Sequence, residues 1–595
     1  MYSEKRNVCQ LLALLKLHGI SHFVVSPGSR HVPVVVSMQN DPFFKLFSIV
    51  DERSASFFAI GLIQQLKEPV GIICTSGTAS ANYCSAINES LYQELPLLVI
   101  TADKPECLRD QHEDQMIRQT TMYQSITKMV ANLPTVETER DAWFNNRLIN
   151  EALLELNHHG KGPVQINIPI PAHTDSFTTK SLPLERKIER HELISTDFRE
   201  IAKQLLGKKI LIACGEGYAI STEQLHYLGE FCEKFGAVVL CDKMSNCHVS
   251  QSIENSFPLL SALSGKDITA LTPDIVISVR ANFSFNPELK SFINKAKTIN
   301  NSIENWYVHE SGRVVDTYQG LLKHIFEIDE FEFFRRVSEV LECSLKQNDY
   351  YEIWKIISES IDEPSNLKNQ IGASSLLLNN LPKNCILQLA NSNSVRVAQL
   401  FHIDPSIEVH CNRGTDGIDG CMSTAIGFAS TSNNLVYLMI GDLSFFYDMN
   451  ALWNRHVGKN IRIFLVNNGG GAVIHMPPRP DSVYEKLPNY ISASHTGKAK
   501  AWAEDRGFLY LGAKTEEEIK ESILTFTNPD LEGPMLLEVF SDMIEDTRDF
   551  KNYYATVNRE KLDQSLKSRS KRVILDVLHV LGLDPMSFKS VLKGK

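Results

Sequence analysis

The stretch IGDLSFFYDMNALWNRHVGKNIRIFLVNNGGG, residues 440–471, decides how the last part of the chain folds. One apolar run ends at Asp442, and the next ends at Asn468 and a glycine run. Two such runs with a helix between them are typical of adjacent parallel strands. Because the carboxyl ends of parallel strands meet at one edge of a sheet, we expect Asp442 and Asn468 to lie close together.

These two strand ends offer the ligands of a magnesium–diphosphate site. The Asp442 carboxylate, the Asn468 amide oxygen and a backbone carbonyl from glycines 469–471 are hard oxygen ligands. Mg²⁺ prefers such ligands and completes its shell with phosphate oxygens and water. Leu443 and Ser444 open the next helix, where backbone N–H groups can hold a phosphate. Ordinary strand-end turns also favour Asp, Asn and Gly, so the spacing alone leaves both interpretations open.

The rest of the chain repeats this alternation of strand-like and helix-like segments. Short β-rich runs end in Gly, Ser, Thr or Asp, and a helical pattern spans residues 52–66. This alternation predicts an α/β fold of doubly wound parallel sheets covered by helices. The strand-like runs are HFVVSPGSR, VGIICTSGTAS, LPLLVITADKP, VQINIPIP, KILIACGEG, AVVLCDK, DIVISVR, CILQLANSNS, LVYLMIGDLS, IRIFLVNNGGG and PMLLEVFSD.

We expect three α/β domains and a tail. With 595 residues the chain is too long for one core, and its length predicts about three or four domains. A polar stretch, residues 176–196, is predicted to link the first two domains. The predicted units are residues 1–180, 195–345, 346–555 and a basic C-terminal extension over 556–595, whose charges we interpret as solvating.

The composition is that of an ordinary folded protein, with 22% charged and 43% hydrophobic residues. The net charge of -11 argues against a general nucleic-acid binder. No long apolar run predicts a membrane span, and the amphipathic N-terminus does not have the pattern of a signal peptide. The 12 cysteines are scattered without a metal-ligand spacing, which favours a reducing compartment and predicts a cytoplasmic location.

Several motifs, in the same order along the chain, resemble one enzyme family. GDLS followed by NN resembles the GDG…NN motif of thiamine-diphosphate enzymes, and VDERSASFFAIGL with TSGTASAN resembles their pyrimidine-binding domain. More narrowly, SPGSR, DERSA, TSGTA, TADKP, NRGTDGIDG and GDLSFFYDMNAL together resemble the 2-succinyl-5-enolpyruvyl-6-hydroxy-3-cyclohexene-1-carboxylate (SEPHCHC) synthase family. Its members are decarboxylating carboligases of menaquinone biosynthesis. The resemblance covers about residues 5–550, strongly at both ends and weakly in the middle.

The resemblance implies a pyrimidine-binding, a central and a diphosphate-binding domain, with thiamine diphosphate and Mg²⁺ or Mn²⁺ as cofactors. It also implies a homodimer or a dimer of dimers with active sites shared between chains. Glu52 of one chain would hydrogen-bond the aminopyrimidine ring held by the other; without the motifs, Glu52 would be a carboxylate favoured by a helix dipole. Ile418 would prop the cofactor in a bent conformation, although core packing explains an isoleucine equally well. The implied cofactor contacts are Glu52, Thr75, Ser76, Ile418, Asp442, Leu443, Ser444 and Asn468, with Asp442, Asn468 and the Gly470 carbonyl as metal ligands.

The substrates implied by the resemblance are 2-oxoglutarate and isochorismate. The first would be decarboxylated, and its succinyl-semialdehyde carbanion would undergo 1,4-addition to the second. Arg396 and Arg413 match the family's cationic clamp for the distal carboxylate, a group that guanidinium forks bind bidentately. Ser392 matches a neighbouring hydroxyl contact. Either arginine alone would more often be a surface residue or part of a structural ion pair.

The match is weaker at the positions that hold isochorismate in the family. Ser29, Arg30 and Gln115 match, whereas Lys104 replaces an arginine and so keeps the charge but loses the planar fork.

Two further departures concern charge. Asn286 and Pro287 stand where the family has a basic pair, and the element HEDQ adds Glu113 and Asp114. We expect these changes to weaken the hold on a dicarboxylated acceptor. The cations that could compensate are Lys290 and Arg280.

Four hypotheses remain at this stage. The first is the SEPHCHC synthase reaction, and the second is the same cofactor chemistry with a different acceptor. The third, a degenerate cofactor-binding paralogue, conflicts with the retained Glu52, Asp442 and Asn468. The fourth, a nucleotide-dependent dehydrogenase, has only the partial glycine motif of Gly215 and Gly217 in its favour.

Overall fold

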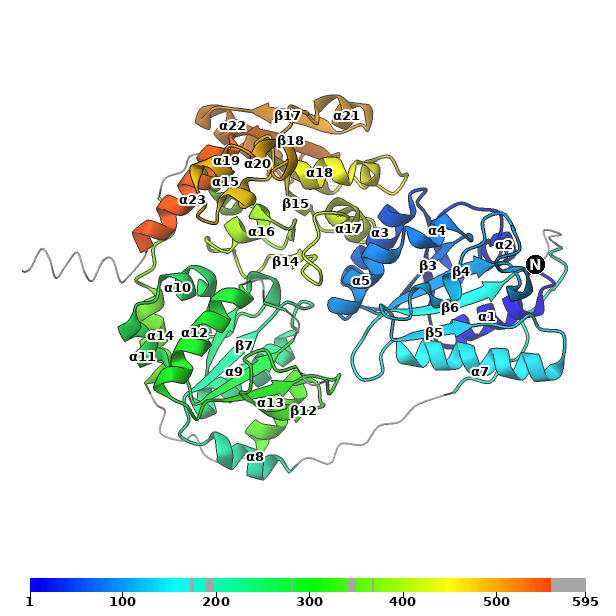
Figure 1. The fold of residues 1–595 in the computed structure, drawn as a ribbon, viewed down its shortest axis with the longest axis horizontal. Helices are drawn as coiled ribbons and strands as arrows, with labels where there is room; N and C mark the ends of the chain where they lie inside the picture. The colour runs from blue at the N-terminus through cyan, green and yellow to red at the C-terminus, as the bar shows by residue number, and fades with distance from the viewer. Residues whose placement is uncertain are drawn as a thin grey trace, which may run out of the picture.

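The fold consists of three parallel sheets flanked by helices, as predicted for an α/β protein (Figure 1). The computed structural model describes residues 1–171, 176–188, 197–280, 282–283, 285–313, 315–340, 349–365 and 369–557. Each sheet has six strands, and the strand orders are β2-β1-β3-β4-β6-β5, β12-β11-β10-β7-β8-β9 and β14-β13-β15-β16-β18-β17.

The first unit is built around the first of these sheets. Three of its strands, Val70–Cys74, Leu97–Asp103 and Val164–Pro169, are wholly buried, as expected for a parallel sheet with both faces covered. Its elements are α1 (Arg6–Leu17), β1 (His22–Val25), α2 (Val32–Gln39), β2 (Lys45–Ser48), α3 (Glu52–Leu66), β3 (Val70–Cys74), α4 (Thr78–Ala81), α5 (Cys84–Tyr92), β4 (Leu97–Asp103), α6 (Gln119–Met122), β5 (Met129–Asn132), α7 (Glu139–Glu155) and β6 (Val164–Pro169).

The second unit follows with a sheet of the same kind. Helix α14 (Tyr350–Ser358) packs on this unit, because the ring of Trp354 lies 5.6 Å from that of Phe292 and the Tyr350 hydroxyl donates to the Leu271 carbonyl. The other elements are α8 (Phe198–Leu205), β7 (Ile210–Cys214), α9 (Thr222–Phe235), β8 (Val238–Cys241), β9 (Ser252–Ile253), α10 (Ser256–Ala262), α11 (Gly265–Leu271), β10 (Ile275–Val279), α12 (Asn286–Ile299), β11 (Glu304–Val308), β12 (Leu322–Phe326) and α13 (Glu330–Glu339).

The third unit contains residues 440–471, the stretch with Asp442 and Asn468. Its elements are α15 (Asn369–Asn380), β13 (Ile386–Leu389), α16 (Asn393–Ala398), β14 (Glu408–Cys411), α17 (Cys421–Ala429), β15 (Val436–Gly441), α18 (Asp442–Tyr447), β16 (Ile461–Asn467), α19 (Asp481–Tyr484), α20 (Leu487–Tyr490), α21 (Lys500–Asp505), β17 (Leu509–Ala513), α22 (Glu516–Phe526), β18 (Met535–Phe540) and α23 (Met543–Val557).

The third unit shares apolar cores with both of the others. Against the first unit, helix α17 lies directly on helix α3 (Figure 1). Glycine makes this approach possible, because a Cβ at Gly61 would lie 2.0 Å from the Thr424 carbonyl oxygen and one at Gly427 would lie 2.1 Å from that of Phe58. The two domains therefore meet backbone against backbone, which fixes the position of the start of α3.

The segment predicted as a linker follows the surface of the first unit over residues 176–188. Tyr2 and Thr179 form an isolated antiparallel bridge, and the Ile188 N–H donates to the Asn150 side chain of α7. Residues 189–196 of the predicted linker, and residues 558–595 of the predicted C-terminal extension, lie outside the described residues. The proposed domain boundaries themselves stay predictions.

Within the described residues, no helix is long and apolar enough to cross a membrane. Every cysteine of these residues is a free thiol.

Candidate active site

The carboxylate of Asp442 lies at the carboxyl edge of the third sheet, next to the turn that contains Asn468. Strands β15 and β16 are parallel neighbours with Gly441 opposite Val466, so both chains leave the sheet at the same level. Oδ2 of Asp442 accepts the backbone N–H groups of residues 468–470 at 3.1, 2.8 and 3.1 Å. The structure thus confirms that the two strand ends meet, and it shows that the carboxylate orders the glycine turn.

The side chain of Asn468 is held by one end only. Its Nδ2 donates to Asp546 Oδ2 at 2.8 Å, whereas its buried Oδ1 has no hydrogen-bond partner among the described residues. Buried polar atoms are nearly always paired in native structures, so an unpaired amide oxygen beside a carboxylate points to a missing ligand. Asp442, Asn468 and the backbone carbonyl of Gly470 supply the oxygen donors that Mg²⁺ prefers, so the residues fit a divalent cation.

The turn after β16 needs glycine for steric reasons. Gly469 and Gly470 have φ values of 79° and 155°. A Cβ at Gly470 would lie 2.8 Å from the Ser492 carbonyl oxygen. Side chains at these positions would displace the backbone beside Asn468, which explains the glycine run of the sequence.

A cavity of about 230 Å³ opens beside these groups. It contains the predicted cofactor contacts Ile418, Asp442, Leu443, Ser444, Asn468 and Gly470, together with Ser392. All residues that line it come from the third unit, between positions 370 and 491. The Ser444 hydroxyl donates to the carbonyl of Ile418 at 2.6 Å, which ties the start of α18 to the loop before α17.

The two predicted clamp arginines lie one layer behind this cavity. Nη1 of Arg413 donates to Asn391 Oδ1 at 2.8 Å, and Nη1 of Arg396 donates to the Ser392 carbonyl at 2.7 Å. Asn391 and Ser392 both line the cavity. Burial, followed by the charge of Arg413, lowers the pKa of Arg396. The arginines therefore act on each other electrostatically, as two cations gathered around one anion site would.

The remaining predicted residues converge at a different edge, that of the first sheet. Arg30 donates through its backbone N–H to Thr75 Oγ1 at 3.4 Å, and through Nη1 to the Ile170 carbonyl at 2.9 Å. Ser29 and Ser76 are the chain neighbours of Arg30 and Thr75 in the same two loops. The two loops follow β1 and β3, and Ile170 follows β6; all three are parallel strands of one sheet.

Lys104 and Gln115 belong to the same edge. Lys104 follows β4 directly, and its Nζ forms an ion pair with Glu113 at 2.8 Å. The backbone of Gln115 lies so near Gly77 that a Cβ on that glycine would be 3.1 Å from the Gln115 carbonyl oxygen. The lysine that replaces the family's arginine is therefore already paired with one of the two added carboxylates.

Glu52 is the first residue of α3 at this edge. Asp51 caps the helix by accepting the Ser54 N–H at 2.9 Å, which fixes where the helix begins. Among the described residues of this chain, neither Glu52 nor any other residue of the first unit lines the 230 Å³ cavity. One chain thus carries two separate sets of predicted site residues.

Arg280 and Lys290, the cations that were predicted to compensate for the missing basic pair, lie in different environments. Arg280 has a left-handed backbone, with φ of 67°, and its guanidinium donates to the carbonyls of Ser245 and Tyr218. Asn286 and Pro287 form the first turn of α12, and Lys290 is exposed on that helix. Arg280 is thus engaged within the second unit.

Three residues at the site were not found from the sequence. His495 lies 3.2 Å from Asp442 Oδ2 through its Nε2, and Asn391 positions Arg413. Asp546 holds Asn468 and also accepts the Gln370 N–H, and burial raises its pKa to about 6. Asp546 lies in the first turn of α23 rather than at the end of β18, and His495 lies in an irregular loop. No sequence signal marked either residue.

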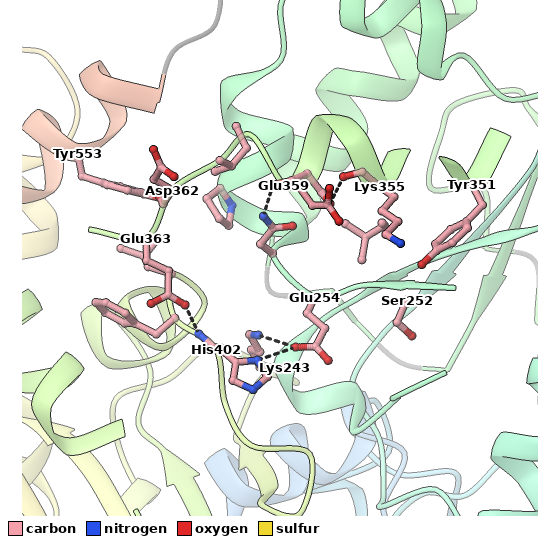
Figure 2. Close-up of a pocket in the computed structure, with 17 residues that line it drawn as sticks. Lys243, Ser252, Glu254, Tyr351, Lys355, Glu359, Asp362, Glu363, His402 and Tyr553 are labelled. Carbon is pink, nitrogen blue, oxygen red and sulfur yellow. Dashed lines mark hydrogen bonds and ion pairs between the residues drawn. The ribbon is translucent and has the colours of Figure 1, made fainter. Parts of the chain in front are cut away.

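A larger cavity, of about 370 Å³, lies where the second unit, helix α14 and the third unit meet (Figure 2). Figure 2 shows Lys243, Glu254 and His402 gathered on one wall. Glu254 pairs with His402 Nδ1 at 3.1 Å, and Lys243 Nζ lies 3.9 Å from the same carboxylate. The backbone N–H of His402 donates to Glu363. Because these charges are paired across the boundary between the second and third units, this cavity is part of a domain interface.

Comparisons with known proteins show the class to which this chain belongs. The family model "Thiamine pyrophosphate enzyme, N-terminal TPP binding domain" matches residues 8–122. A benzoylformate decarboxylase from Polynucleobacter necessarius has a similar fold, with a TM-score of 0.65 at 16% sequence identity over 91% of this chain and 99% of that one. Fold, domain match and cation site together define a thiamine-diphosphate-dependent enzyme, with a divalent cation as its second cofactor.

Sequence similarity narrows the class further. The chain is 40% identical over 560 residues to the SEPHCHC synthases of Bacteroides thetaiotaomicron and Phocaeicola vulgatus, which covers 93% of this chain and 99% of each relative. It is 32% identical over 559 residues to that of Flavobacterium johnsoniae, covering 91% of this chain and 97% of the relative. The chain belongs to the SEPHCHC synthase family, as the motifs predicted.

Proposed function

We propose that the protein decarboxylates 2-oxoglutarate and joins the remaining succinyl unit to isochorismate by 1,4-addition, as a step of menaquinone biosynthesis. The observation that carries this proposal is the unpaired Asn468 Oδ1 beside Asp442, at the edge of a cavity lined by the predicted cofactor contacts. Membership in a family whose members are named for this product supports the reaction.

The chain's own residues would hold the cofactors as follows. Asp442, Asn468 and the Gly470 carbonyl would bind the cation, and the backbone N–H groups of Leu443 and Ser444 would receive the diphosphate at the start of α18. When bound, thiamine diphosphate supplies the electron sink that decarboxylation of a 2-oxo acid requires. Glu52 would hold a proton at the aminopyrimidine ring.

Substrate binding would rest on charge. Arg413, which is buried, and Arg396, which is half-buried, lie behind Asn391 and Ser392 and would attract the distal carboxylate of 2-oxoglutarate. The edge that contains Arg30, Lys104 and Gln115 would face the acceptor.

We also propose a homodimer, or a dimer of dimers, in which Glu52 of one chain completes the cavity of another. The separation of the two residue sets within one chain supports this arrangement, because no described residue of the first unit lines the cavity of the third. A reducing, cytoplasmic setting is part of the proposal and is supported by the free cysteines of the described residues.

A second candidate keeps the cofactor chemistry but changes the acceptor. The ion pair between Lys104 and Glu113 favours it, because this cation is neutralised at the edge where a dicarboxylated acceptor would bind. The absence of a basic pair at Asn286 and Pro287 acts in the same direction.

Product analysis tests both candidates. The protein is incubated with thiamine diphosphate, Mg²⁺, 2-oxoglutarate and isochorismate, and the products are identified by mass spectrometry. We expect carbon dioxide and the cyclohexene adduct. Decarboxylation without the adduct would support the second candidate, and no decarboxylation would overturn the proposed function.

A further inference from the structure

Helix α5 of the first unit contacts the loop of the third unit that contains Arg413. Glu89 lies on this helix and is 1% exposed. Its Oε1 accepts the Gly414 N–H at 2.9 Å, and its Oε2 accepts the Thr415 N–H at 2.8 Å and the Thr415 hydroxyl at 2.6 Å. One carboxylate therefore receives both backbone donors that directly follow Arg413.

Gln93, the residue that directly follows α5, holds the loop on the other side of Arg413. Nε2 of Gln93 donates to the Cys411 carbonyl at 2.8 Å and to Glu89 Oε1 at 2.9 Å. The contact is close: a Cβ at Gly414 would lie 2.7 Å from the Glu89 carbonyl oxygen. The backbone on both sides of Arg413 is thus bound to α5.

The side chain of Arg413 leads from this clamped backbone to the cavity. Its Nη1 bonds to Asn391 Oδ1 and pairs with Asp416 at 2.9 Å, and Asn391 lines the cavity. A shift of the backbone would therefore move the guanidinium relative to the cavity. Misplacement of a binding group by about 1 Å can cost on the order of 100-fold in rate.

We propose that Glu89 is a positioning residue that sets the substrate selectivity of the enzyme by holding the Arg413 loop against helix α5. The proposal rests on the proposed function, because it assigns Arg413 to the distal carboxylate of a 2-oxo dicarboxylic acid. A carboxylate suits the task because it has only acceptor sites, and every group that contacts it here is a donor. Burial raises the pKa of Glu89, and the bonds from Thr415 and Gly414 oppose that shift.

The test compares wild type, Glu89→Gln and Glu89→Ala, each loaded with thiamine diphosphate and Mg²⁺. In Glu89→Gln an NH₂ group replaces one acceptor and faces a backbone donor. We expect the ratio of kcat/KM for 2-oxoglutarate to kcat/KM for pyruvate to fall about tenfold, mostly through KM for 2-oxoglutarate. Glu89→Ala should show a larger fall, and Arg413→Ala the largest.

Amide hydrogen exchange provides a readout that does not depend on activity. We expect the segment 411–416 to exchange at least about tenfold faster in Glu89→Gln than in wild type. Unchanged exchange, or an equal loss of activity on both acids, would overturn the proposal. A wild-type protein without activity on 2-oxoglutarate would instead overturn the proposed function, and exchange would still decide whether Glu89 holds the loop.

Asp448→Asn is the matched control. Asp448 is also fully buried and also accepts a backbone N–H and a serine hydroxyl, both from Ser423, with a longer bond from the Ser54 hydroxyl. Among the described residues it forms no hydrogen bond with the Arg413 loop. We expect this variant to lose thermal stability without changing the selectivity ratio. A loss of selectivity in Asp448→Asn equal to that in Glu89→Gln would show that general destabilisation is the cause.

Discussion

The cavity between the second and third units and the cavity beside Asp442 differ in a way that volume alone does not reveal. The larger one, about 370 Å³, is lined by charged groups that already pair with one another across the boundary between the second and third units (Figure 2). The smaller one, about 230 Å³, contains Asn468, whose buried Oδ1 has no partner among the described residues. Unpaired donor and acceptor atoms, rather than size, identify the site that awaits a ligand.

The largest effect on cofactor binding should come from an asparagine of the smaller cavity, compared with one of the larger cavity. Asn468→Ala removes the unpaired oxygen, and we expect thiamine-diphosphate affinity in Mg²⁺ to fall by about 100-fold, in line with losses seen when metal-site groups are removed. Asn255 lines the larger cavity and donates to the Ser358 carbonyl. Asn255→Ala should leave cofactor affinity unchanged. Calorimetric titration with the cofactor measures both, and equal affinities would remove the distinction between the cavities.

The next prediction tests whether the smaller cavity is only half of a site. Glu52→Gln should retain the cofactor and lose about 100-fold or more of decarboxylation, the range expected for a general acid–base group. When Glu52→Gln and Asn468→Ala chains are co-expressed, mixed dimers would combine both defects in one site and leave the other intact. We therefore expect activity to reappear. Mixed dimers that stay inactive would show that Glu52 serves its own chain.

The smallest effect, a change in stability, is expected at the larger cavity, between the second and third units. His248, Lys243 and His402 hold the pKa of Glu254 at about 2, below its ordinary value, with the His248 hydrogen bond as the largest cause. Because the pKa of Glu254 is lower in the folded protein than in the unfolded chain, its charged form stabilises the fold at pH values above the unfolded pKa. This stabilisation is lost as the pH falls toward the folded pKa.

The corresponding variant is Glu254→Gln. We expect it to lose about 1 kcal/mol of stability at pH 7, a value reduced for solvent screening. The loss should shrink as the pH falls from about 4.5 toward 2. Thermal unfolding followed across this range measures the difference, with cofactor affinity as the control. A loss of stability that does not depend on pH would mean that packing, and not charge, stabilises the interface between the second and third units.

Much of the fold was predictable because strand ends and helix periods are local signals. The helical pattern over residues 52–66 is helix α3, and the runs that end at Asp442 and Asn468 are neighbouring strands. Short edge strands such as β9 and β12 were missed, because two to five residues carry little periodicity. The placement of α14 on the second sheet was also missed, because packing partners are not encoded within a single helix.

The sequence by itself determined the kind of protein: parallel sheets, a carboxylate and an amide at adjacent strand ends, and motifs in the order typical of one family. These features depend on residue type and spacing, which the sequence states directly. Only the tertiary structure decided that Asn468 Oδ1 is left unpaired, that Lys104 is neutralised by Glu113, and that Glu89 holds the Arg413 loop. None of these follows from residue type and spacing, because each depends on how packing places side chains and backbone groups against one another.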